Sequence, residues 1–147
     1  MKFGVNLLNF GPGASPHNLR KWGQVAEELG YHFVMISDHI VNTPDVEKLF
    51  PAPFYDPFIV LAWLPEVTQK VELGTTVTIL PYRHPLQTAR MVANIDQLSG
   101  GRFVFGVGAG WAEQEFDALG IPFHHRGAIA NENLSVIRDF WTKDTTC

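Results

Sequence analysis

The sequence predicts an α/β fold with a parallel sheet, and two observations support this prediction. Short apolar runs rich in β-branched and aromatic residues alternate four times with longer segments in which apolar residues recur at helical spacing. Successive runs lie roughly 30 to 40 residues apart, a spacing that fits βαβ units. Right-handed connections between parallel strands build either an open doubly wound sheet or part of a barrel, and the pattern leaves both open.

The first unit is a strand over residues 3–7 followed by a helix. Apolar residues alternate with small or polar ones in this strand, and the helix begins at Ser15-Pro16 and ends at Gly30. Serine accepts hydrogen bonds from free N–H groups of the first turn, proline fits the first helical position, and glycine adopts the left-handed conformation that ends a helix. The apolar stripe of this helix predicts a face packed against the core.

The second strand covers residues 33–36 and ends directly in Ser37, Asp38 and His39. The segment that follows has prolines at positions 44, 51, 53 and 57. It is too rich in proline for regular structure and longer than the usual connection of about 4 to 6 residues, so we expect a lid or a binding loop. A helix over about 58–68 is apolar nearly all round, which predicts packing on more than one side.

The third strand covers residues 71–79, and its helix runs from Pro85 to about Gly100. The fourth strand begins at residue 103 and passes into glycines 106, 108 and 110 before Trp111. These glycines either admit a ligand close to the backbone or only relieve crowding. A loop and a last helix over about 126–141 complete a single domain of residues 1–147, with a frayed tail over 143–147.

Composition excludes several classes of function. The chain has 147 residues, of which 46% are hydrophobic and 18% charged, with a net charge of −4. This is the balance of a globular domain, and the absence of a Lys/Arg cluster argues against nucleic acid as a partner. No apolar run approaches the ~20 residues that span a bilayer, and the N-terminus lacks a signal-peptide pattern, so we expect a cytoplasmic protein without a membrane partner. The single cysteine, Cys147, cannot form an internal disulfide.

The candidate site lies where the strands end, because loops at the carboxyl ends of parallel strands meet on one face. His39 is the best candidate for proton transfer, since imidazole titrates near neutral pH; alternatively, it only bonds neighbouring loop backbone. Asp38 accepts a hydrogen bond from a cofactor, orients His39, or caps the following turn. The same face is predicted to contain Thr76, Thr78, Arg83, His84, Gly108, Gly110, Trp111, Glu113 and Glu115.

Several common motifs are absent. The dinucleotide fingerprint fails because Trp111 or Glu113 stands where glycine or alanine is needed. Neither a phosphate-binding loop nor a nucleophile elbow occurs. Of six histidines only His124 and His125 are adjacent, which is not the spacing of a helical metal pair, so we expect no metal site. The Phe and Trp residues are interpreted as core.

Residues 30–39, 73–77, 106–116 and 119–123, in this order and spacing, resemble the luciferase-like monooxygenase superfamily of flavin- and F420-dependent oxidoreductases. The resemblance implies a TIM barrel, of which this chain supplies the N-terminal half in about four β/α units. It also implies a cofactor, coenzyme F420 or FMN, across the carboxyl ends of the strands. The function implied is hydride transfer or oxygen activation on a small organic substrate.

The resemblance assigns roles to particular residues. It places Asp38 and His39 beside the cofactor ring, with His39 as acid or base. Thr76-Val77 matches a place where the family often has a non-prolyl cis peptide against the ring. The backbone of residues 108–111, which are Gly108, Ala109, Gly110 and Trp111, is expected to contact the cofactor. F420-dependent sugar-phosphate dehydrogenases have a catalytic carboxylate at the position of Trp111, so we do not expect their substrate specificity.

The length of the chain has a structural consequence. A full barrel needs eight units and about 250 residues, and a half-barrel leaves two strand edges and the barrel interior uncovered. The chain is therefore either a truncated product or one of two copies that close a barrel together, and we expect a homo-oligomer. The alternative to an enzyme is a catalytically silent half-barrel that acts as a dimerising or binding scaffold.

Overall fold

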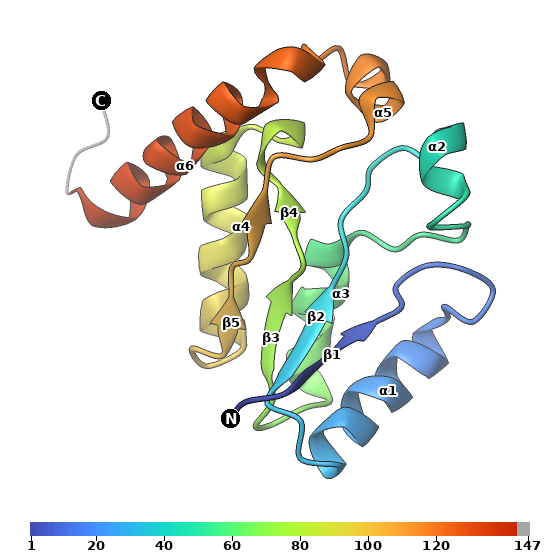
Figure 1. Cartoon of the computed structure of the whole chain (residues 1–147). Coiled ribbons are helices and arrows are strands. Elements are labelled where there is room, and N and C mark those ends of the chain that lie inside the picture. The colour runs from blue at the N-terminus through green and yellow to red at the C-terminus, as the bar shows by residue number, and fades with distance from the viewer. Residues whose placement is uncertain (144–147) are drawn as a thin grey trace.

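The computed structural model describes residues 1–143 and confirms the predicted alternation of strands and helices (Figure 1). Four parallel strands form a sheet in the order β1-β2-β3-β5, and β4 pairs with β6 in a short parallel continuation. The strands are β1 (Gly4–Leu7), β2 (Phe33–Ile36), β3 (Glu72–Thr75), β4 (Thr78–Ile79), β5 (Phe103–Val104) and β6 (Val107–Gly108). Residues 144–147, with Cys147 and most of the tail predicted to be frayed, lie outside the described residues.

The helices follow the expected order with two additions. They are α1 (Pro16–Glu28), α2 (Pro44–Glu47), α3 (Pro57–Trp63), α4 (Pro85–Leu98), α5 (Glu113–Ala118) and α6 (Arg126–Thr142), with 3₁₀ turns at Leu64–Glu66, Leu80–Tyr82 and Phe123–His125. The prediction that the proline-rich segment lacks regular structure was wrong at α2, which has Pro44 at its first turn. Helix α5 was not predicted. Each of these helices has fewer residues than two helical turns, too few to show a periodic apolar pattern.

The third and fourth predicted strands are each divided in two. The Thr76–Val77 peptide bond separates β3 from β4 and is cis, as the resemblance implied. Phe105 and Gly106 separate β5 from β6. A Cβ atom at Gly106 would lie 2.1 Å from the carbonyl oxygen of Thr75, so only glycine allows the two backbones to approach this closely.

Helices α1, α3 and α4 cover one face of the sheet. Side chains that alternate along the strands point into this layer, where Val34, Ile36 and Leu73 are fully buried. The core also includes Leu7, Leu19, Ala26, Phe58, Val60, Leu61, Leu64, Val71, Val92 and Ile95. The sheet and these helices therefore form the two layers of a β/α unit with a continuous apolar core.

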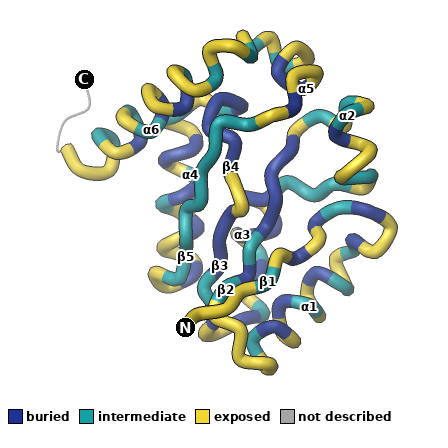
Figure 2. The backbone as a smooth tube through the Cα atoms, in the orientation of Figure 1, coloured by how far each residue is buried: buried dark blue, intermediate teal, exposed yellow. Residues whose placement is uncertain are grey.

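No described element covers the opposite face of the sheet (Figure 2). Asn6 and Thr76 are exposed there, and Phe33, Met35 and Val104 are half-buried. These side chains and Gly4 and Val5 line an open cavity of about 420 Å³. Parallel sheets normally have both faces buried. The uncovered face of this half-barrel therefore corresponds to the inner face of a complete barrel.

Candidate functional site at the carboxyl ends of the strands

The carboxyl ends of β1, β2 and β3 are joined by polar side chains. Asn6 Nδ2 donates to Ser37 Oγ at 3.2 Å, and Thr76 Oγ1 donates to Asn6 Oδ1 at 3.4 Å. Asn9 is fully buried; its Nδ2 donates to the carbonyl oxygen of Ser37 at 2.9 Å, and its Oδ1 accepts from Ser37 N at 3.3 Å. The end of each strand therefore has a fixed position relative to its neighbour. The loop after β2 leads to α2, and the loop after β6 leads to α5 (Figure 1).

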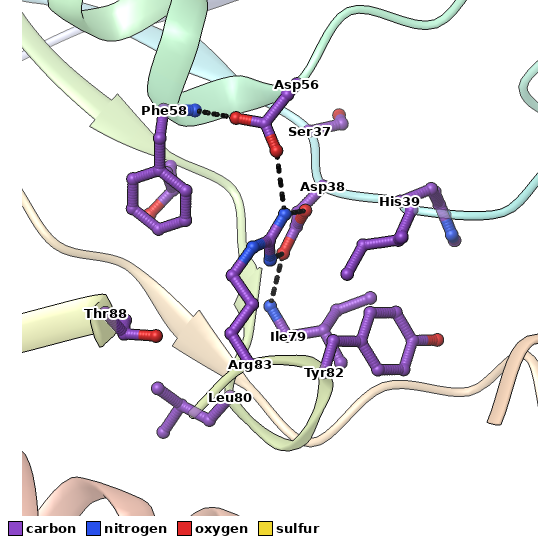
Figure 3. A network of polar contacts seen from close by, with 12 residues as sticks. Ser37, Asp38, His39, Asp56, Phe58, Ile79, Leu80, Tyr82, Arg83 and Thr88 are labelled. Carbon is purple, nitrogen blue, oxygen red and sulfur yellow. Dashed lines mark hydrogen bonds and ion pairs between the residues drawn. The ribbon is translucent and has the colours of Figure 1, made fainter. Parts of the chain in front are cut away.

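Arg83 connects three of these loops (Figure 3). Its Nη1 and Nη2 atoms donate to the two carboxylate oxygens of Asp38 at 2.7 and 2.8 Å, and Nη2 also donates to Asp56 Oδ2 at 3.0 Å. Asp56 in turn caps α3 by accepting from Phe58 N. Burial alone would lower the pKa of Arg83, but Asp38 and Asp56 raise it above its ordinary value. The guanidinium therefore stays charged and holds β2, α3 and the end of β4 together.

The carboxylate of Asp38 is used within the protein. Besides Arg83, the backbone N–H of Ile79 donates to its Oδ2 at 2.9 Å, and the side chain has no exposed surface. A direct contact between Asp38 and a cofactor stays a prediction. The interpretation that Asp38 orients His39 is wrong, because the side chain that bonds His39 is Glu115.

Glu115 lies at the centre of a second buried network and is 0% exposed. Its Oε2 accepts hydrogen bonds from His39 Nδ1 at 2.6 Å and from Tyr82 Oη at 2.8 Å. Its Oε1 accepts from the backbone N–H groups of Ile40 at 2.5 Å and Val41 at 2.9 Å. Every donor around Glu115 therefore points at a carboxylate oxygen, an arrangement that stabilises the ionised form.

The protonation states follow from this environment. Burial alone would raise the pKa of Glu115, but hydrogen bonds from His39, Val41, Ile40 and Tyr82 outweigh it and lower the pKa below 4.5. Burial, together with the adjacent Glu115 charge, raises the pKa of Tyr82 above its ordinary value. At neutral pH the site therefore contains a Glu115 carboxylate and a protonated Tyr82 hydroxyl.

We predict that Glu115 makes stability depend on pH in acid. Its pKa is lower in the folded chain than in the unfolded chain, so its contribution is complete above pH 4.5 and is lost as the pH falls through the folded value. The difference in free energy of unfolding between wild type and Glu115→Gln should be constant near neutrality and shrink below pH 4.5. Denaturant titrations across this range measure it. Glu113→Gln, exposed on the same helix, should follow the wild-type profile, and parallel profiles for wild type and Glu115→Gln would contradict the prediction.

Aromatic rings surround His39. The His39 ring lies 4.7 Å from Phe50, 5.7 Å from Phe54 and 5.8 Å from Trp111, measured between ring centroids. Phe10 stacks on Phe54 at 5.7 Å. Core packing was the default interpretation for phenylalanines, most of which fall in helices or strands; Phe10, Phe50 and Phe54 depart from it, because they lie in loops, are only half-buried and stay outside the core clusters. Trp111 is 46% exposed, so the ring cluster around His39 reaches the surface.

The remaining predicted residues form a second group. Pairing of β4 with β6 places Gly108 beside Val77, and a Cβ atom at Gly108 would lie 2.6 Å from Val77 Cγ2. Thr76 and Val77 are exposed, whereas Ala109 packs toward α4 and α6. Gly110 has a φ angle of 83°, which favours glycine. The exposed residues of the Thr76–Val77 cis peptide thus lie beside the glycine backbone at Gly108.

Two expected absences concern the described residues. Within residues 1–143, no three His, Cys, Asp or Glu side chains gather as a metal site would require. No helix in the same range has the length and apolar character needed to cross a membrane.

Comparison with known proteins identifies the family. A family model described as luciferase-like monooxygenase matches residues 1–146. The chain belongs to the luciferase-like monooxygenase family. Its similarity to the F420-dependent glucose-6-phosphate dehydrogenase of Amycolatopsis mediterranei is 35% identity over 136 residues, which is 88% of this chain and 39% of that enzyme. The chain spans 31–39% of the length of the curated luciferase-like relatives that it matches.

Solved structures of the luciferase-like type confirm the half-barrel. The monooxygenase RslO1 from Streptomyces bottropensis superposes with a TM-score of 0.85 at 30% identity, covering 99% of this chain and 44% of that one. Riboflavin lyase RcaE, solved with modified FMN and riboflavin, superposes with a TM-score of 0.78 at 26% identity. The superposition covers 95% of this chain and 37% of the RcaE chain. The family therefore includes relatives that use F420 and relatives that bind FMN.

Proposed function

We propose that the chain is the cofactor-ring half of a flavin- or F420-dependent oxidoreductase that acts on a small organic substrate. The observation that supports this most strongly is the cis peptide Thr76–Val77 beside the glycine backbone at Gly108, three residues before Trp111, whose ring contacts His39. The glycine backbone and the aliphatic side chain of Val77 suit the flat face of a tricyclic ring, and the Thr76 hydroxyl already has a partner in Asn6. FMN or F420 would supply the redox chemistry once bound.

The residues of the chain then have separate tasks. Thr76–Val77 and the backbone of Gly108–Gly110 would hold the ring, and Trp111 would border the substrate side. His39, which is only 6% exposed, would donate or accept the substrate proton in a place that excludes bulk water. The enclosing phenylalanines favour a substrate with an apolar portion. A cytoplasmic location, without nucleic-acid or membrane partners, remains part of this proposal.

Titration of the purified chain with FMN and with F420 tests the function. We expect micromolar binding of at least one of them, followed by hydride transfer from the small organic substrate to the bound oxidised cofactor. Val77→Asp, which puts a charge on the exposed platform, should abolish binding, whereas Leu98→Asp, at a more exposed position on α4, should not. Failure of both cofactors to bind the folded chain would contradict the proposal and favour the scaffold function.

We also propose that a second copy covers the open face of the half-barrel. Beside β1, an apolar groove is lined by Trp22 and Val25 of α1 and by Leu29, which caps this helix. Beside β5, Phe103 and Trp141 line another. A two-fold axis along the barrel would pair β1 of each copy with β5 of the other, making two identical seams. Both unpaired edges and both grooves would then be closed.

Light scattering measures the molar mass of the chain in solution and therefore its oligomeric state. The chain should have twice its 16.5 kDa mass in solution. Leu29→Glu should give monomers, because Leu29 is 70% exposed in one copy and would lie in the seam, while Leu98→Glu, 65% exposed on α4, should remain dimeric. A folded wild-type monomer at high micromolar concentration would contradict the proposed dimer. It would leave the proposal of cofactor binding to its own titration.

A further inference from the structure

We infer that Glu115 is the positioning residue for His39: it fixes the proton of the neutral imidazole on Nδ1, so that Nε2 is the atom that accepts a proton from substrate. The inference rests on the proposed function, in which His39 is the acid–base group, and it adds the atom that acts and the residue that selects it.

The two oxygens of Glu115 have different partners. Oε1 accepts from the backbone N–H groups of Ile40 and Val41, which donate whatever the protonation state of the site. Oε2 accepts from His39 Nδ1 and Tyr82 Oη. Since a carboxylate only accepts hydrogen bonds, the 2.6 Å contact requires a proton on Nδ1 of His39. One oxygen therefore holds the loop, and the other selects the tautomer.

The second nitrogen of His39 is left for chemistry. Within residues 1–143 no side chain or backbone group bonds Nε2, and Phe50, Phe54 and Trp111 surround the ring. The charged groups near the network are Asp38 and Arg83, which pair with each other, and Asp45, which acts on Tyr82 from a distance. None of them competes with Glu115 for Nδ1. In the neutral imidazole, Nε2 then has a free lone pair inside an apolar enclosure.

The variant Glu115→Gln separates positioning from a purely structural role. The backbone donors of Ile40 and Val41 require an acceptor, so the amide oxygen of the substituted side chain would face them and its NH₂ group would face His39. An NH₂ group donates, so Nδ1 would have to accept and the imidazole proton would move to Nε2. A residue of the same shape, with the loop contacts kept, would thus reverse the tautomer.

Long-range ¹H–¹⁵N correlation spectra of chain labelled at histidine measure the tautomer without any cofactor. His39→Gln identifies the resonances, and spectra are followed to the alkaline plateau, where the ring is neutral. We expect a protonated Nδ1 in wild type, a protonated Nε2 in Glu115→Gln, and the wild-type pattern in Tyr82→Phe, which removes only the other donor to Oε2.

A wild-type ring protonated at Nε2 would overturn the inference even if Glu115→Gln fails to fold, and so would Nδ1 protonation retained in folded Glu115→Gln. In the cofactor-loaded chain, Glu115→Gln should lower kcat about 100-fold or more, the scale of lost general acid–base catalysis. KM should change little. If no cofactor binds, the proposed function fails, whereas the tautomer spectra still decide the role of Glu115.

Discussion

Replacement of Glu115 by leucine is expected to lower the free energy of unfolding by about 3–5 kcal/mol, because each buried donor left without an acceptor costs about 1–3 kcal/mol. The change leaves four donors without their acceptor: the buried His39 Nδ1 and Tyr82 Oη, and the partly buried N–H groups of Ile40 and Val41. Leucine has nearly the volume of glutamate, so lost hydrogen bonding rather than an empty cavity causes the effect. Urea denaturation at fixed protein concentration measures it.

Glu113→Leu is the matched control, because Glu113 lies on the same helix and is exposed. It should change the free energy of unfolding by no more than about 0.5 kcal/mol. Equal, small effects of both substitutions would show that the buried network does not stabilise the loop after β2.

Replacement of Arg83 by methionine is expected to cost a similar amount, about 3–5 kcal/mol, because it leaves the buried carboxylate of Asp38 without its cation. Asp38 would keep only the N–H of Ile79 as a donor. The change also removes the bond to Asp56 and the packing of the guanidinium 5.1 Å from the centre of the Phe58 ring. Denaturant titration should show a lower midpoint, and the ends of β2 and α3 should lose amide protection first.

Lys143→Met controls for the loss of a cation. Lys143 pairs with Asp139 at 2.8 Å, but both side chains are about half exposed or more, at 61% and 48%. Such a pair contributes about 0.2–1 kcal/mol, so the variant should unfold close to wild type. If Arg83→Met were no more damaging than Lys143→Met, Asp38 would not depend on Arg83 for its charge.

The sequence predicted the order of the elements because each strand lies in a short apolar run or an apolar alternation and each long helix has clear boundaries. Pro16 begins α1 and Pro85 begins α4, while Gly30 and Gly100 follow their ends. Since all parallel strands present their carboxyl ends to one side, polar residues after each strand could be assigned to one site. The cis peptide at Thr76–Val77 came from the family resemblance alone.

The partners within the site could not be predicted, because they depend on distances between residues far apart in the chain. His39 and Glu115 are 76 positions apart, and a sequence does not show which of several carboxylates reaches a histidine. Asp38, the nearest carboxylate along the chain, is held by Arg83 instead. Phe50 and Phe54 lie in a proline-rich loop without periodicity, so their packing against His39 left no pattern to recognise.

We expect the platform of Thr76–Val77 and Gly108–Gly110 to bind the cofactor ring on the side of His39. Backbone ¹H–¹⁵N spectra of the assigned chain, recorded during titration with FMN or F420, test it residue by residue. The largest shifts should fall on Thr76, Val77, Gly108, Gly110 and the indole N–H of Trp111, with little change in α6. Shifts confined to other surfaces, or none at saturating cofactor, would contradict it.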